Sequence, residues 1–211
     1  MTAGRPRGID DAAILRATVT VIGRVGPVGL TLAAVASEVG LVPGTLVQRF
    51  GSKRGLLLAL ADWAAKDADA LLARVRAEHE TALAALAALI VAPTRSMATP
   101  EAFANHLAFL CIDLTDPDFR RPALAIHQAQ GRAVEALLTE ALLAGDLRPG
   151  TDVADLGRSV QAIASGVGLV WALERQGSLE QRLRQALDSV LSPHLRPLSG
   201  DTFNSDNEEG T

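Results

Sequence analysis

The sequence predicts an all-α protein, and three observations support this fold class. Of the 211 residues, 48% are apolar and only 3% are aromatic, and alanine and leucine, which strongly favour helices, dominate the apolar residues. Apolar residues recur at helical spacing, as in the stripe at positions 14, 15, 18, 19 and 22. Candidate caps and glycine or proline breaks divide the chain into segments of ordinary helix length.

Each expected helix follows from a start and a stop signal. The first covers about residues 10–25, and the glycines and proline at 26–29 break it. Its β-branched run at 18–22 would also suit a strand, but the apolar stripe favours a helix. The candidate N-caps of later helices are Thr31, Ser52, Thr99, Thr151 and Ser178. These helices are expected at about 31–39, 43–50, 52–76, 79–92, 100–115, 119–144, 151–176 and 178–191.

Composition excludes several classes of protein. The single cysteine, Cys111, excludes an internal disulfide and a metal site built from cysteines, and its apolar neighbours favour a buried thiol. The longest purely apolar run, 82–92, is shorter than the ~20 residues of a membrane-spanning helix. Residues 1–7 contain no apolar signal-peptide core. We therefore expect a cytoplasmic protein with no membrane partner.

The charges are distributed unevenly along the chain. The formal net charge is −4, which by itself argues against a nucleic-acid partner. Residues 1–54 hold seven basic and three acidic side chains, a net +4, whereas the remainder holds 13 basic and 21 acidic side chains, a net −8. A basic segment on an acidic chain indicates a polyanionic partner.

The chain shows no catalytic, cofactor-binding or metal-binding motif. The four histidines, at 79, 106, 127 and 194, lack the spacing of zinc-binding helices. The glycine-rich stretch 23–29 does not match a dinucleotide-binding loop, and neither a phosphate-binding loop nor a nucleophile elbow occurs. We therefore predict no catalytic residue, no cofactor and no metal, and we do not expect an enzyme.

Residues 31–50 are predicted to form two short helices joined by a tight turn at Gly40, the arrangement of a helix-turn-helix unit. Such a unit can place the small residues at the start of its second helix in the ~12 Å major groove of DNA. Ser52 begins a further helix, whose free N–H groups suit a phosphate. The alternative is that 31–50 is only a helical hairpin within a bundle.

The stretch 29–60 closely resembles the DNA-binding domain of the tetracycline-repressor-like (TetR) family. The points of match are Gly29-Leu-Thr31, Ala36, Gly40, Pro43-Gly-Thr-Leu46, Phe50, Ser52-Lys53 and Leu56-Leu57. The resemblance implies a DNA-binding domain with a basic N-terminal arm at 1–54 and a helical effector-binding and dimerisation domain at 55–198. We expect a disordered acidic tail at 199–211. The resemblance also implies a transcriptional regulator, a repressor that a small apolar ligand releases from its double-stranded operator.

The resemblance and side-chain chemistry together give the candidate DNA-binding residues. They are Arg5, Arg7, Thr31, Pro43, Gly44, Thr45, Val47, Gln48, Arg49, Ser52 and Lys53. The arm's two arginines suit a narrow minor groove, or the arm is an ordinary basic tail, while Gln48 and Arg49 suit adenine and guanine edges. The chain departs from the family at Val47, Val42 and Ala33, where tyrosine, a capping serine and arginine are common. Base reading could therefore turn to thymine methyl groups, contacted by Val47 and Thr45.

The ligand-binding candidates stand on or beside apolar stripes of the middle and penultimate helices. They are His106, Phe109, His127, Gln130 and Trp171. Such residues suit an apolar pocket with few polar anchors, although each could instead belong to the core. Small residues such as Gly157 and Gly168 would let a partner helix approach, which favours a homodimer through the last two helices over burial within one subunit. The alternative function is a helical ligand- or protein-binding module with weak or lost DNA binding.

Overall fold

The computed structural model describes residues 9–197, and among them it contains nine α-helices, two short 3-10 helices and no strand. The predicted all-α class is therefore confirmed. Arg5 and Arg7 of the expected arm, and the expected tail at 199–211, lie outside the described residues.

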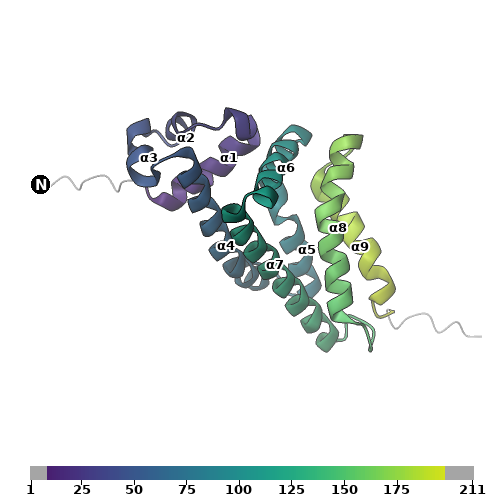
Figure 1. Cartoon of the computed structure of the whole chain (residues 1–211). Helices are drawn as coiled ribbons and strands as arrows, with labels where there is room; N and C mark the ends of the chain where they lie inside the picture. The colour runs from purple at the N-terminus through teal and green to yellow at the C-terminus, as the bar shows by residue number, and fades with distance from the viewer. Residues whose placement is uncertain (1–8, 198–211) are drawn as a thin grey trace, which may run out of the picture.

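The helices divide into a small head and a larger body. The elements are α1 (Asp11–Gly29), α2 (Leu32–Glu38), α3 (Pro43–Phe50), α4 (Lys53–Glu78), α5 (Ala82–Val91), α6 (Pro100–Thr115), α7 (Pro117–Ala144), α8 (Val153–Glu174) and α9 (Leu179–Leu191), with 3-10 helices at Ala92–Ser96 and Ser192–His194. Figure 1 shows α1, α2 and α3 together at one end and α8 beside α9 at the other. The long helix α4 leads from the head into the body, and α6 stands between the head and α8.

Side-chain caps set most helix starts where the sequence predicts them. The hydroxyl oxygens of Thr31, Ser52, Thr99 and Ser178 each accept a hydrogen bond from the backbone N–H three residues later. The prediction for Thr151 is wrong, because the Asp152 carboxylate caps α8 at 2.9 Å while the Thr151 hydroxyl donates to the Arg148 carbonyl. An aspartate also interacts favourably with the positive end of the helix dipole.

Helix α1 is broken near its end, as the glycines and proline predict, but one more helical turn follows the break. Gly26 has φ +64°, a left-handed conformation that favours glycine. Pro27 has no N–H, so it cannot donate to the Gly23 carbonyl four residues earlier. The side-chain amide of Asn105 on α6 donates to that carbonyl instead, at 2.9 Å. The carbonyl left without a partner by the break in α1 thus receives its hydrogen bond from the body.

The head has a core of its own, which continues into the body. Its buried residues are Ile14, Leu15, Val21, Ile22, Leu30, Val35, Ala36, Leu46 and Leu56, with Trp63 and Phe109 packed against them. A second core joins α5, α7, α8 and α9 around residues such as Leu86, Leu138 and Val160. The predicted division after residue 54 therefore falls within a continuous helix whose next turns pack on the head.

Two helices, α1 and α8, are long and apolar enough to cross a membrane by length and composition alone, and α5 with α6 would make a third span bent by 97°. In the folded molecule the apolar side of α1 is buried in the head core. Helix α8, by contrast, leaves Leu169, Val170 and Leu173 exposed. The apolar character of α8 therefore exceeds what one subunit buries.

Candidate DNA interface and ligand cavity

Helices α2 and α3 form the predicted helix-turn-helix. Val35, Ala36 and Leu46 are buried between them, and Gly40, with φ +68°, allows the tight turn in which the Leu41 N–H donates to the Ala36 carbonyl at 2.8 Å. This packing fixes α3 on the rest of the head and leaves its opposite side exposed.

The exposed side of α3 carries most of the residues predicted to contact bases. Pro43, Gly44 and Gln48 are exposed and Thr45 is half-buried. Val47 keeps 50% of its surface exposed. Val42 precedes α3 with 68% exposed, and it supplies no side-chain cap, as its departure from the usual serine implies. The first turn of α3 is therefore apolar and small, and its backbone N–H groups are not covered by a capping side chain.

Two of the cationic side chains predicted to contact DNA make hydrogen bonds within the protein. The Arg49 guanidinium donates to the Ile9 carbonyl at 2.6 Å and pairs with Asp11 at 3.2 Å, at the start of α1. The Lys53 ammonium donates to the Pro27 carbonyl at 2.6 Å, just after the break in α1. Thr31 and Ser52, predicted phosphate contacts, use their hydroxyl oxygens as helix caps and remain exposed.

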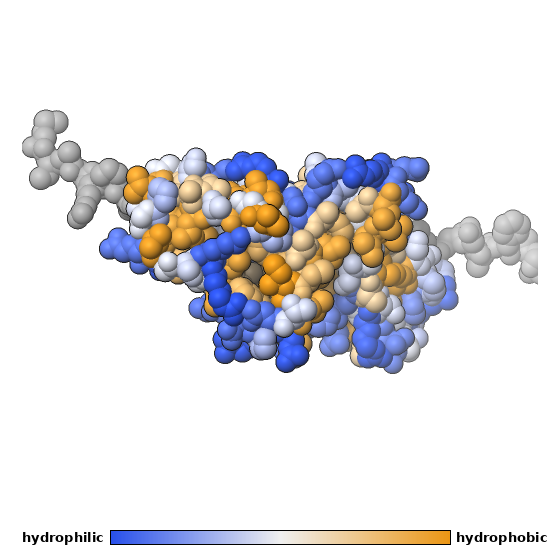
Figure 2. All heavy atoms as spheres, turned by 45° about the horizontal axis from the view of Figure 1, so that its top comes forward, coloured by the Kyte–Doolittle hydropathy of each residue, from blue (hydrophilic) through white to orange (hydrophobic). Residues whose placement is uncertain are grey.

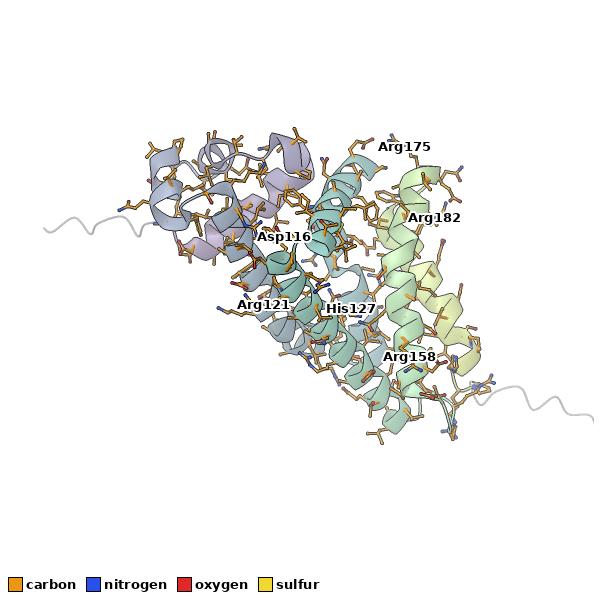
Figure 3. The ribbon with its side chains drawn as sticks, in the orientation of Figure 1. Asp116, Arg121, His127, Arg158, Arg175 and Arg182 are labelled. Carbon is orange, nitrogen blue, oxygen red and sulfur yellow. The ribbon has the colours of Figure 1, made fainter. Side chains whose placement is uncertain are left out.

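Arg54 joins the head to the body, a role that sequence reasoning missed because it counted Arg54 only as head charge. Its guanidinium pairs with Asp116, the N-cap of α7, and with Asp118 at 2.8 Å. It also lies over the Phe119 ring, 5.0 Å from the ring centre. These hydrogen bonds hold the pKa of the Asp116 carboxyl below its ordinary value. Figure 3 shows Asp116 at the start of α7, next to the head.

An apolar cavity of about 280 Å³ lies where head and body meet. Helices α1, α4, α6 and α7 all contribute to its wall, and Figure 2 shows a hollow bordered by apolar residues between the head and the rest of the molecule. The lining residues are Val19, Ile22, Leu57, Leu60, Ala61, Trp63, Ala64, Ser96, His106, Phe109, Leu110, Ile112, Phe119, Ala123 and Ile126. Two of the ligand candidates, His106 and Phe109, are therefore brought together here.

His106 is the unusual polar group of this cavity. Its Nε2 atom is buried, and within the described part of the chain it has no hydrogen-bond partner. Burial lowers the pKa of the His106 imidazole below its ordinary value, an effect that the Ser96 backbone partly opposes. Burial therefore favours the neutral form of the ring.

The other three ligand candidates lie elsewhere. His127 and Gln130 line a second cavity of about 170 Å³, whose wall also includes residues of α5, α8 and α9. Figure 3 shows His127 midway along α7, away from Asp116. Trp171 is buried, its indole N–H donates to the Gly177 carbonyl at 3.0 Å, and its ring meets Phe103 edge-on. The five candidates therefore do not form one site, because α6 and α7 each face more than one neighbour.

Contrary to the prediction from sequence, two of the small residues of α8 do not face a partner helix. Gly157 and Gly168 face α7 and α6 of the same chain, where any side chain would meet Glu135 or Phe103. They serve packing within the subunit rather than the approach of a partner. A groove lined by Ile163, Val167, Val170 and Ala186 does remain open between α8 and α9.

The remaining predictions from composition concern metals and the cysteine. Among residues 9–197, no group of histidine, cysteine and carboxylate side chains is placed to hold a metal ion. Cys111 is exposed, so the prediction of a buried thiol is wrong: the helix turns this side chain away from the core although its neighbours in sequence are apolar.

Comparison with known proteins finds a family similar to the head. The sequence profile of "Bacterial regulatory proteins, tetR family" matches residues 14–60, which cover the helix-turn-helix. Over these residues the chain is similar to the TetR family. No curated protein sequence matches it. The matched family consists of regulators rather than enzymes, as the sequence predicts.

Solved structures show that the TetR fold extends over most of the chain. A TetR transcription regulator from Haloarcula marismortui has a TM-score of 0.68 at 17% identity, covering 88% of this chain and 98% of its own. SmeT of Stenotrophomonas maltophilia, the repressor of the multidrug efflux pump SmeDEF, has a TM-score of 0.61 at 20% identity, covering 90% and 92%. A protein from Saccharomonospora viridis, solved in complex with choline, has a TM-score of 0.67 at 19% identity, covering 88% and 96%.

The partly buried imidazole of His106 makes one contribution to stability depend on pH. Because the pKa of His106 is lower in the folded protein than the ~6.5 of an unfolded chain, the folded state binds this proton less readily. The contribution is present above that pH and is lost as the pH falls below it. We expect His106→Gln to lose less unfolding free energy between pH 7 and pH 5 than the natural protein, measured by urea denaturation. His127→Gln, at an exposed position, is the matched control. Equal losses in all three proteins would contradict this.

Proposed function

We propose that this protein is a homodimeric transcriptional repressor of the TetR family in the cytoplasm, released from its operator by a small apolar ligand. The observation that carries the proposal is the exposed first turn of α3 within a domain that matches a DNA-binding family. Small residues there permit close approach of the backbone to base edges, and the helix is narrow enough for the major groove.

The dimer is supported by the end of the molecule opposite the head. Helix α8 exposes Leu169, Val170 and Leu173 next to the groove between α8 and α9. Contiguous exposed apolar surface of this kind marks interaction sites in soluble proteins. A two-fold axis through this surface would pair two copies and leave both heads free. Two heads can then read half-sites about one helical turn, ~34 Å, apart.

The ligand is assigned to the cavity at the junction of head and body. Its wall includes Val19 and Ile22 of α1, so a ligand there touches the head directly. A ligand that fits better when α1, α4 and α6 are displaced shifts the population toward heads that no longer match adjacent half-sites. The described lining residues are mostly apolar and include no carboxylate, which favours an apolar ligand.

A binding module with weak or lost DNA binding is the second candidate function. The observation that favours it is the engagement of Arg49 and Lys53 with α1 and with Ile9, which precedes it, because both side chains were expected to contact DNA. The two functions differ in whether the full chain selects any DNA.

Selection of duplexes by the full chain from a random 30-base-pair pool separates these two functions. We expect a two-fold symmetric sequence with half-sites about one turn apart, and footprinting should protect the same sequence in DNA flanking the protein's own gene. Enrichment of no sequence at modest salt would favour the second function.

Two charge substitutions, one on the proposed interface and one away from it, test the dimer. Val170→Asp places a charge on the exposed α8 surface, and Leu143→Asp places one at an exposed position on α7. We expect Val170→Asp to elute as a monomer and to lose DNA binding, while Leu143→Asp keeps both properties. Helical content, measured by circular dichroism, should be unchanged in both variants. A dimeric Val170→Asp protein would place the interface elsewhere.

The basic arm supplies a separate prediction. Arg5 and Arg7 contribute half of the net charge of residues 1–54, so deleting residues 1–8 should weaken binding and reduce its salt dependence. If both arginines contact DNA, the slope of log K against log salt concentration falls by about 1.8 per protomer. The comparison uses the full chain and the truncated chain on one selected duplex. An unchanged slope and affinity would reject the arm as a DNA contact.

The ligand assignment is tested by filling the cavity. We expect neutral aromatic compounds, with 1-naphthol as the first probe, to raise the melting temperature and to weaken binding of the selected duplex by about tenfold. Ala64→Phe narrows the cavity and should abolish both effects, whereas Ala70→Phe, at an exposed position on the same helix, should keep them. Equal responses in the two variants would exclude this cavity.

A further inference from the structure

We propose that α3 recognises its half-site through apolar contacts of Val42 and Val47 with the C5-methyl groups of thymines. The inference rests on the proposed function, since it requires that the protein bind duplex DNA. It goes further by naming the chemical feature of the operator that the protein reads and the two residues that read it.

The two valines are the exposed large apolar side chains at the N-cap of α3 and within it. Val42 immediately precedes the helix, and Val47 lies one turn beyond Gly44, beside Gln48. Both are at least half exposed, whereas Leu46 between them is fully buried. Gly44 leaves open space in front of this surface, because a side chain there would meet no other atom within 4 Å. The backbone of α3 can therefore approach a flat partner closely.

Few polar side chains are exposed on this surface. Arg49, the one cationic side chain of α3, is turned back to Ile9 and Asp11. Guanine is most often read by arginine or lysine, and neither is available on the exposed side of the helix. Thr45 and Gln48 remain as hydrogen-bonding groups, and glutamine suits the N6 and N7 edge of adenine.

The major groove contains a single apolar group, the C5-methyl of thymine. Valine side chains that enter the groove therefore gain most when they meet that methyl, and they leave polar base edges unpaired anywhere else. An A·T pair presents the methyl together with the adenine edge that Gln48 can bind. The structure thus points to half-sites in which α3 lies over A·T pairs.

The test replaces thymine by deoxyuridine, which removes only the methyl group and keeps base pairing. On a duplex selected by the full chain, each thymine of one half-site is replaced in turn and the dissociation constant is measured. We expect a loss of about fourfold at one or two positions, the worth of one buried methyl group, and no loss at the others. Replacing the same position in both half-sites should cost roughly 15-fold.

Variants assign the methyl contact to a residue. Val47→Ala or Val42→Ala should bind the thymine and deoxyuridine duplexes equally at one sensitive position each, because the partner of the methyl is gone. Val28→Ala, which alters an exposed valine of the head away from α3, is the matched control and should keep the full deoxyuridine penalty. The inference is overturned if specific binding is intact but no deoxyuridine position matters, or if the penalty survives in both α3 variants. Failure to select any duplex would overturn the proposed function and this inference with it.

Discussion

The break in α1 determines how the head is attached to the rest of the molecule. Pro27 removes the N–H that the buried Gly23 carbonyl would accept, and Asn105 of α6 replaces it. One turn later, the Pro27 carbonyl accepts from Lys53 of α4. A buried carbonyl left without a donor costs about 1–3 kcal/mol. Helices α4 and α6 therefore cannot move away from α1 without either breaking these bonds or carrying the head with them.

The same helices form the wall of the junction cavity. His106 follows Asn105 on α6, and its ring and the Phe109 side chain face the space that Val19 and Ile22 border from α1. On the other side, Phe119 lines the cavity while its ring lies under the Arg54 guanidinium. A molecule in this cavity would press directly on both links between head and body. Under the proposed function, this arrangement would couple the orientation of the head to what the cavity contains.

Local signals in the sequence were sufficient to predict most of the fold. Caps such as Thr31 and Ser52, and breaks such as Gly26, act within a few residues, so their effect can be read from adjacent positions. Thr151 failed as a cap because two good capping residues stand side by side, and which one caps depends on the turn before them. The predicted helix ends agree with the structure to within a few residues, because caps and breaks act locally.

The site was less predictable because its contacts join residues far apart in the chain. Arg49 and Lys53 have the side chains of DNA contacts, but only the folded head shows that Ile9, Asp11 and Pro27 engage them. The five ligand candidates share an apolar context in sequence, yet His106 and His127 face different cavities. One usable signal was present: Pro27 in an apolar helix implies an orphaned carbonyl, and Asn105 is a polar residue on a largely apolar helix.

Most of the positive charge of the described part of the head is already engaged within the protein. Residues 9–54 hold five basic and three acidic side chains, a net +2, and the other two positive charges of residues 1–54 belong to Arg5 and Arg7. Four of the five basic side chains are engaged with α1, α2 or the body. Phosphate contacts supply most non-specific affinity for DNA. If the proposed function holds, we expect a head with few uncommitted cations, attached to an acidic body, to bind random DNA weakly and to discriminate through what the surface of α3 matches in the groove.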